Sequence, residues 1–304
     1  MVTTVPLFSI LVPTRNRPEL AATCVRSILA QGEHDFELLV LDQSDDRATC
    51  DAVAAAAADS SRTRHVAVSG RGRSLSLNAG IGEARGQWIV MTDDDCEAEP
   101  GWLDGLQAEA RAAGPRDAIV GRVRPGPVQP GKSLPPATIE DPEPSIYTGR
   151  VDRDLVYPNF AVPGTAFDAI GRFDVRMGVG TTLPGGEDND FGYRLLRAGW
   201  RILYRPGPTV VHCAWRSTEE RAALKRAYGT GQGAFYAKHL ASADPFIAYR
   251  FARDVLRTAR AAGGALIRGW PAECRGHLDY LAGLFVGAAR MTSLMARGVR
   301  SDRA

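Results

Sequence analysis

The feature that most constrains the fold is an apolar segment that ends in three consecutive acids. Residues 88–91 are all apolar and predict a buried strand, and Asp93, Asp94 and Asp95 follow almost at once. Three neighbouring carboxylates are too costly to bury without cationic partners. The strand must therefore emerge at its carboxyl end, where open α/β sheets bind their ligands.

Two explanations fit this acid cluster. Because side chains alternate along an extended chain, Asp93 and Asp95 point to the same side, and such a pair suits a hard divalent cation. The alternative is a polar turn that caps the next helix, with Glu97 and Glu99 as acids of its first turn. Taken alone the cluster favours the cap, so the rest of the chain has to decide.

Strands and helices alternate along the first part of the chain. This alternation predicts an α/β fold, with a mostly parallel central sheet and helices on both faces. The expected strands cover residues 7–12, 36–41, 65–68, 88–91 and 118–121. The expected helices cover residues 18–31, 47–58, 74–84, 100–113 and 187–198. Two further short strands are expected at residues 201–204 and 209–212, on either side of a Pro-Gly-Pro turn.

The pattern changes twice after residue 124. Residues 124–144 are rich in proline and glycine, which predicts a long loop over the active face. From residue 216 the pattern is helical to the end, and breaks are predicted near residues 229–233, near residues 263–264 and at Pro271.

The helical end of the chain is basic. Residues 216–304 contain 15 Lys and Arg against 7 Asp and Glu, although the whole chain has a net charge of only +2. Amphipathic helices with this charge suit peripheral contact with acidic lipid headgroups. The alternative, which we favour at this stage, is a helical cap that packs on the rest of the chain or forms a homodimer.

Five cysteines are scattered along the chain without a CxxC pair. This pattern predicts reduced thiols, and neither a disulfide framework nor a zinc site. The expected location is the cytoplasm, with or without attachment to the inner face of the cell membrane.

Several short motifs occur in a characteristic order. They are Val12–Arg17, Asp42 at the end of the second strand, Leu77–Gly80, Thr92–Asp95, Gly186–Asp190 and Val211–His212. In this order they resemble the family 2 glycosyltransferases of the GT-A fold, over roughly residues 7–215. The resemblance implies inverting transfer of a hexose from a UDP-, GDP- or dTDP-linked donor to a hydroxyl acceptor, assisted by Mn²⁺ or Mg²⁺.

The resemblance also implies a metal and base-recognition site. Asp93 and Asp95 match the D-x-D motif that holds the metal, and in some relatives a histidine at the place of His212 completes the metal shell. Asp94 would contact the ribose or turn inward. Asp42 would accept a hydrogen bond from the ring N–H of the nucleotide base, or would simply cap its strand.

Further donor contacts are implied around the first strand and the third helix. Arg73 and Asn78 lie near the start of that helix, where basic side chains and helix N-termini favour phosphate. For Asn78 the alternative is a buried amide that ties the helix to the sheet. The wall beside the base and ribose would consist of Pro13, Thr14, Arg15 and Asn16.

A catalytic base is implied at the start of a later helix. An inverting transfer needs a group that takes the proton of the acceptor hydroxyl. Asp188 matches this base, and Glu187 would orient the donor or acceptor. The alternative is that both are helix-start acids that interact with the helix dipole.

The expected domains follow from the same resemblance. Residues 1–215 would be the catalytic domain, in which residues 1–124 bind the nucleotide sugar and residues 125–215 the acceptor, followed by a helical extension over residues 216–304. The acceptor would be a saccharide, a lipid-linked saccharide or a natural product, and no nucleic-acid partner is expected.

Two other functions were weighed. A sugar-phosphate nucleotidyltransferase shares a related sheet, but it would need a glycine-rich loop after the first strand, where this chain has residues 13–17 without glycine. A non-catalytic nucleotide-sugar-binding scaffold is the other alternative, and the presence of Asp93, Asp95 and Asp188 argues against it.

Overall fold

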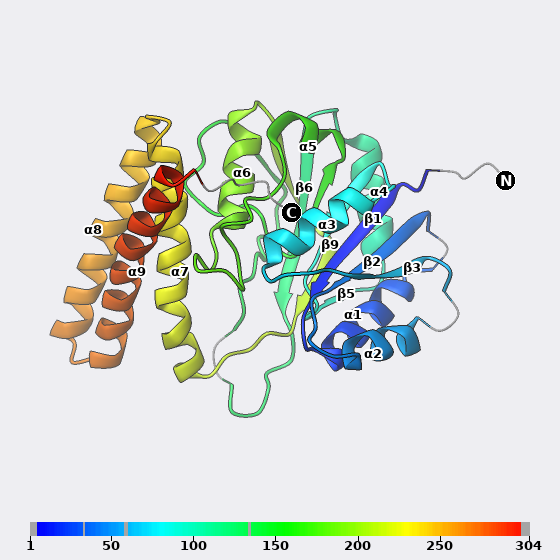
Figure 1. The fold of residues 1–304 in the computed structure, drawn as a ribbon, viewed down its shortest axis with the longest axis horizontal. Helices are drawn as coiled ribbons and strands as arrows, with labels where there is room; N and C mark the ends of the chain where they lie inside the picture. Colours follow the sequence, from blue (N-terminus) through cyan, green and yellow to red (C-terminus); the bar gives the residue numbers. More distant parts are fainter. Residues whose placement is uncertain (1–4, 33, 58–59, 133–134, 299–304) are drawn as a thin grey trace.

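A mixed sheet runs through the centre of the molecule, and helices cover both of its faces (Figure 1). The computed structural model describes residues 5–32, 34–57, 60–132 and 135–298. Its nine-stranded sheet has the order β3-β2-β1-β4-β8-β6-β9-β5, and β7 also pairs with β9. Among these described strands, β5, β7 and β8 run against the other six. The predicted α/β fold with a mostly parallel sheet is therefore confirmed.

The elements have the following bounds. The strands are β1 (Phe8–Thr14), β2 (Phe36–Asp42), β3 (Thr63–Ala67), β4 (Trp88–Met91), β5 (Cys96–Ala98), β6 (Asp117–Pro125), β7 (Ser145–Tyr147), β8 (Phe160–Pro163) and β9 (Arg201–His212). The helices are α1 (Pro18–Leu29), α2 (Ala48–Ala56), α3 (Arg73–Glu83), α4 (Trp102–Ala112), α5 (Thr165–Ile170), α6 (Glu187–Arg197), α7 (Thr218–Leu240), α8 (Pro245–Ile267) and α9 (Pro271–Ala296).

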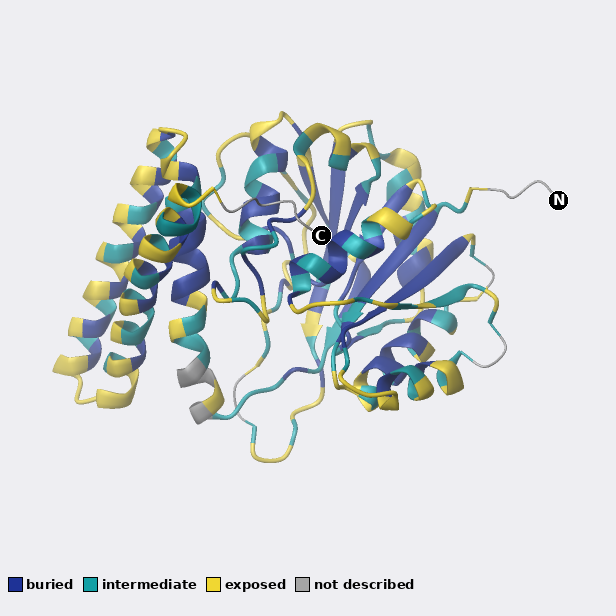
Figure 2. Ribbon diagram, in the orientation of Figure 1, coloured by how far each residue is buried: buried dark blue, intermediate teal, exposed yellow. Residues whose placement is uncertain are grey.

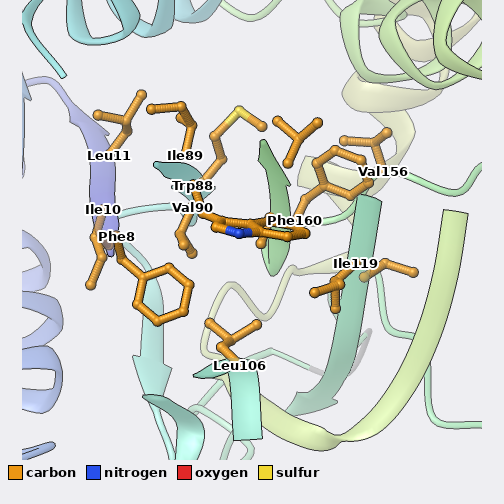
Figure 3. Close-up of a cluster of buried hydrophobic side chains, with 14 of the residues drawn as sticks. Phe8, Ile10, Leu11, Trp88, Ile89, Val90, Leu106, Ile119, Val156 and Phe160 are labelled. Atoms are coloured by element: carbon orange, nitrogen blue, oxygen red, sulfur yellow. The ribbon is translucent and has the colours of Figure 1, made fainter. Parts of the chain in front are cut away.

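The main core lies between the sheet and its covering helices. Strands β1, β2 and β4 are buried along almost their whole length, as their continuous apolar sequences require (Figure 2). Figure 3 shows Trp88 of β4 in this core, surrounded by Phe8, Leu106 and Ile119 from a strand, a helix and another strand. The Trp88 side chain thus anchors β4 in the main core.

The carboxyl ends of three neighbouring strands meet at one edge. Thr14 at the end of β1 is in register with Asp42 at the end of β2, and Leu11 is in register with Met91 at the end of β4. The acids that follow β4 therefore emerge beside the ends of β1 and β2, as expected for a ligand-binding edge.

Local sequence signals mark several helix starts. Pro18, Pro245 and Pro271 occupy the first turn of α1, α8 and α9, where a missing backbone N–H costs nothing. Helix α7 begins with a capping box between Ser217 and Glu220.

Two predicted breaks in the C-terminal helices are wrong. Helix α7 continues through Gly229 and Gly233, and α8 continues through residues 263–264; only the break at Pro271 occurs. The α7 glycines serve close packing instead of ending the helix. A Cβ atom on Gly233 would lie 1.9 Å from the carbonyl oxygen of Leu284, and one on Gly287 would lie 1.8 Å from that of Thr230.

The two short strands predicted around residues 206–208 form one strand, β9. Its register with β6 jumps from Gly121–Arg205 to Arg122–Thr209, so the Pro-Gly-Pro residues bulge out without ending the pairing. Proline is tolerated at such a bulge because it has no N–H to donate to the ladder.

Two simpler expectations have a clear outcome. All five cysteines are free, as predicted. In the described part of the chain, none of the helices combines the length and the apolar character needed to cross a bilayer.

The close packing of α7 on α9 predicts opposite effects of one substitution at two sites. We expect Gly233→Ala to destabilise the protein by about 1–3 kcal/mol, because the added methyl group meets a backbone oxygen of α9. Gly263→Ala is the matched control: nothing lies within 4 Å of its added Cβ, so alanine should stabilise α8 by about 0.5–1 kcal/mol. Urea unfolding followed by circular dichroism measures both. Equal shifts in one direction would contradict the packing.

Candidate active site

The three acids after β4 point to different partners. Asp94 turns inward, where the Thr14 hydroxyl donates to its Oδ2 at 2.8 Å and the Arg17 guanidinium donates to its Oδ1 at 2.9 Å. Burial raises the pKa of Asp94 to about 6, although Arg17 acts in the opposite direction. The Asp94 side chain thus links the segment after β4 to the end of β1 and to the turn that follows it.

Asp95 faces a histidine from the far end of β9. The antiparallel pairing of β5 with β9 places Cys96 opposite His212, and the His212 Nε2 atom lies 3.3 Å from Asp95 Oδ1. Burial lowers the pKa of His212, but the hydrogen bond and charge of Asp95 outweigh this and raise it above its usual value. The imidazole and the carboxylate thus stabilise each other's charged forms.

These two side chains belong to a cluster that fits a divalent cation. Among the residues that the structure describes, the donor atoms of Asp95, Cys96 and His212 lie within 4.8 Å of one another. Burial raises the pKa of Cys96 well above its usual value, so its sulfur stays protonated and is a poor ligand. The remaining carboxylate and imidazole donors suit a cation such as Mn²⁺.

Asp93, the other half of the D-x-D motif, pairs with Arg73. The Arg73 Nε donates to Asp93 Oδ1 at 3.0 Å, and its Nη1 donates to Asp188 Oδ1 at 2.9 Å. The same Nη1 lies 3.6 Å from Glu187 Oε1. A single guanidinium therefore joins the acids after β4 to the acids at the start of α6. Although burial lowers the pKa of Arg73, the charges of Asp188, Asp93 and Glu187 raise it well above its usual value.

The start of α6 places two acids in different environments. Gly185 and Gly186 precede it with φ of +97° and +82°, a left-handed backbone that favours glycine. Glu187 is buried, and burial raises its pKa to about 7. The side chain of Asp188 keeps 32% of its surface exposed, and burial of the rest also raises its pKa, against the effect of Arg73. Of these two acids, Asp188 is thus the accessible one.

Asp42 is buried at the end of β2 with both oxygens engaged. Its Oδ1 accepts from the backbone N–H of Ser44 at 2.8 Å, and its Oδ2 lies 2.9 Å from His65 Nε2. The contact with Ser44 is the strand-end cap that was one of its two expected roles. The contact with His65 was not anticipated, because the histidine comes from the neighbouring strand β3.

Residues 15 and 16 are tied to the loop after β2. The Arg15 guanidinium donates to Asp45 at 2.6 Å, and Asn16 and Asp45 exchange two hydrogen bonds, at 2.8 and 2.9 Å. Pro13 is half-buried beside this loop. Arg15 and Asn16 thus link the turn after β1 to the loop after β2, whereas residues 13 and 14 of the predicted wall belong to β1 itself.

Asn78 is buried, and its side-chain amide is engaged within the fold. Its amide donates to the carbonyl oxygen of Phe173 at 2.8 Å and accepts from the Phe173 N–H at 2.9 Å. It joins α3 to the segment after α5, and not to the sheet. Both ends of the amide are used within the fold.

Arg17 and Gln43 are two polar residues that sequence reasoning did not assign. Arg17 contacts both Asp94 and Asp95, and its only sequence signal is its place in the polar turn after β1. Gln43 follows Asp42 and is buried; its Oε1 accepts from the N–H of Gly72 at 3.2 Å, while its Nε2 has no partner among the described residues.

The predicted loop over the active face lies against the cluster of Asp95, Cys96 and His212. The His212 Nδ1 atom is 3.1 Å from the carbonyl oxygen of Ala137, and Gln129 donates to the carbonyl oxygen of Cys213 at 2.7 Å. The loop therefore orients the imidazole from the side opposite Asp95.

Comparison with known proteins identifies the family. Residues 9–170 match the family model described as glycosyl transferase family 2. The chain belongs to glycosyltransferase family 2. This assignment confirms the predicted resemblance and makes the protein a glycosyltransferase, in place of the nucleotidyltransferase considered above.

A stretch of 116 residues is 34% identical to the succinoglycan biosynthesis protein ExoO of Rhizobium meliloti (strain 1021). The match covers 38% of this chain and 33% of that protein, so the chain spans about a third of the curated relative.

Solved structures of low sequence identity share the fold. The mannosyltransferase PcManGT of Pyrobaculum calidifontis, in complex with GDP-Man and Mn²⁺, is 17% identical with a TM-score of 0.59, over 93% of this chain and 88% of that one. TarS of S. aureus is 17% identical with a TM-score of 0.54, over 76% and 43% of the two chains. GalNAc-T7 with UDP, GalNAc and Mn²⁺ is 15% identical with a TM-score of 0.56, over 80% and 53%. The fold of this family 2 member is therefore GT-A.

The buried Glu187 predicts a defined pH dependence of stability. Its folded pKa of about 7 exceeds the ordinary value of 4.5, so its contribution to stability is full below about pH 4.5 and is lost as pH rises through about 7. Glu187→Gln cannot ionise and should become more stable relative to wild type over that interval. Urea unfolding of both proteins at several pH values measures the difference. A constant difference would show that Glu187 is not titrating there.

Proposed function

We propose that this chain is an inverting glycosyltransferase in which Asp188 is the general base. The observation that carries the proposal is the Arg73 guanidinium, which contacts Asp93 on the donor side and Asp188 on the acceptor side. The two halves of the reaction, departure of the nucleotide and attack by the acceptor, are thereby held within the reach of one side chain.

Asp188 has the properties that the attack step requires. The acceptor oxygen forms a bond to the anomeric carbon as the bond from that carbon to the diphosphate breaks, and the hydroxyl proton passes to Asp188. Its partly exposed side chain makes it reachable, and its raised pKa makes it a better proton acceptor than an ordinary aspartate. The Arg73 guanidinium donates to Asp188 Oδ1, which orients the Asp188 carboxylate. The buried Glu187 carboxylate lies 3.6 Å from the same guanidinium.

The donor side is assigned to the ends of β1, β2 and β4. We assign a divalent cation, Mn²⁺ or Mg²⁺, to Asp95 and His212 together with Asp93; when bound it would neutralise charge on the leaving diphosphate. Arg73 adds positive charge at the same place. The nucleotide of a UDP-, GDP- or dTDP-sugar is assigned to Asp42 and to residues 13–16, at the ends of β2 and β1. GDP-Man with Mn²⁺ and UDP with Mn²⁺ in two structures of the same fold support this assignment.

The acceptor side is assigned to a polar cavity of about 380 Å³ between residues 152–157 and the C-terminal helices. Carboxylates, arginines and tyrosines line it, including Asp152, Tyr236 and Arg250, and such groups both donate to and accept from sugar hydroxyls. Asn189, next to the proposed base, donates to Gln232 of this cavity at 2.6 Å. We therefore propose a saccharide acceptor that the helical extension, residues 216–304, helps residues 125–215 to bind.

Removing the proposed base should abolish transfer without affecting the donor. Asp188→Asn should lower kcat by about 10²–10⁴ while the Kd for the nucleotide stays within about twofold. Release of nucleoside diphosphate measures turnover, and calorimetry with UDP, GDP and dTDP measures binding. Asp168→Asn, an exposed aspartate of α5, is the control and should behave as wild type. Full turnover of Asp188→Asn would remove Asp188 from the mechanism.

Metal removal should stop the reaction, and His212 should set the metal concentration that restores it. We expect EDTA to abolish turnover and Mn²⁺ or Mg²⁺ to restore it. His212→Ala should need at least about tenfold more metal, because a nitrogen donor is lost. His277→Ala on α9 serves as control, since that imidazole pairs with Glu273 far from the acids. Unchanged turnover in EDTA would refute the metal role.

A further inference from the structure

The turn between α8 and α9 exposes an unusual set of apolar side chains. Ile267 is 89% exposed, Leu266 is 66% exposed and Trp270 is 50% exposed. They lie within five residues of one another, on both sides of Arg268 and Gly269. Single exposed apolar residues are ordinary, but three large ones at one tip mark a surface that contacts something else.

The apolar tip continues along the outer face of α8. Leu256, Arg260 and Ile267 are spaced by four and seven residues, so they lie on one side of the helix, and all three are exposed. On α9, Leu278 is exposed as well. Apolar side chains and an arginine thus share the exposed side of α8.

Among the described residues, three of the four arginines in residues 256–278 lack an acidic partner, and the fourth, Arg257, pairs with Asp254 at 3.0 Å. Residues 256–278 contain four arginines and one glutamate. Within the described parts of the chain, no carboxylate lies at ion-pair distance from Arg260, Arg268 or Arg275, and Arg268 instead stacks over the Trp270 ring at 4.5 Å. By contrast, Arg250 and Arg253, at the acceptor-side cavity, both pair with Asp152. The positive charge of the turn is therefore available to an external anion.

The turn also has a defined place in the molecule. Figure 1 shows it at the lower end of the helical layer, the end toward which β6 and the loop of residues 126–132 also point. Figure 2 shows the turn as fully exposed. A flat surface in contact with the turn would thus lie on the same side of the molecule as the carboxyl ends of the parallel strands, where the acids emerge.

We propose that the α8–α9 turn docks on an anionic lipid surface. Leu266, Ile267 and Trp270 enter the headgroup region, and the arginines bind lipid phosphates. A tryptophan beside aliphatic side chains and arginines is the composition that the bilayer interface favours. A second copy of this chain is a poorer occupant, because a twofold contact would bring the unpaired arginines of both copies together.

Sedimentation with vesicles tests the proposal on the full chain, without any sugar substrate. Vesicles of phosphatidylglycerol and phosphatidylcholine should pellet the protein, whereas vesicles of phosphatidylcholine alone should leave it in solution. Binding should fall with added salt, because arginine contacts with the charged surface are screened. Absence of binding to the anionic vesicles would overturn the proposal.

Matched variants locate the contact. Ile267→Glu combined with Trp270→Glu should weaken vesicle binding at least tenfold, and Arg268→Gln should weaken it about fivefold. Ile146→Glu, at an exposed position of β7, is the control and should bind as wild type. Binding by the double variant that equals wild type would refute the assignment. A wild-type homodimer in sedimentation velocity that becomes a monomer only in the double variant would also refute it, because the turn would then be a protein interface.

Discussion

The geometry of the site depends on the Arg73 guanidinium. Without it, the buried Glu187 and the partly buried Asp93 and Asp188 would be three neighbouring carboxylates with no cation between them, and their mutual repulsion would drive them apart. Arg73 is the first residue of α3, and its own N–H donates to the carbonyl oxygen of Val179 at 2.9 Å. The start of α3 therefore positions the charge that joins the segment after β4 to the start of α6.

Much of the fold follows from local patterns in the sequence. Buried strands such as residues 88–91 are continuous apolar runs, and the acids after them emerge where a parallel sheet binds ligands, so both were predictable. The C-terminal glycines were misread because helix propensity is local, whereas Gly233 is fitted to the backbone of Leu284, a partner 51 positions along the chain. The sequence of α7 alone does not reveal this contact between Gly233 and Leu284.

The residues of the candidate site were easier to predict from the sequence than the contacts between them. Motif order brought Asp93, Asp188 and His212 together, but it left open that Asp94 turns inward. That outcome depends on Thr14 and Arg17, which come from a strand 80 residues earlier and the turn after it. Such contacts connect residues that only the three-dimensional packing makes neighbours, and periodicity carries no signal for them.

The glycines of α7 have a consequence for the chain as a whole. A Cβ atom on Gly231 would lie 2.3 Å from the backbone of Gly185, and one on Gly186 would lie 2.4 Å from the Gly231 carbonyl oxygen. The backbone of α7 therefore forms a rigid stop directly behind the turn that presents Glu187 and Asp188. This backbone contact, the hydrogen bond from Asn189 to Gln232 and the ion pair of Lys238 with Asp190 together connect the packing of α7 to the start of α6. The position of the α6 acids thus depends on side-chain-free backbone in a helix more than 40 residues further along the chain.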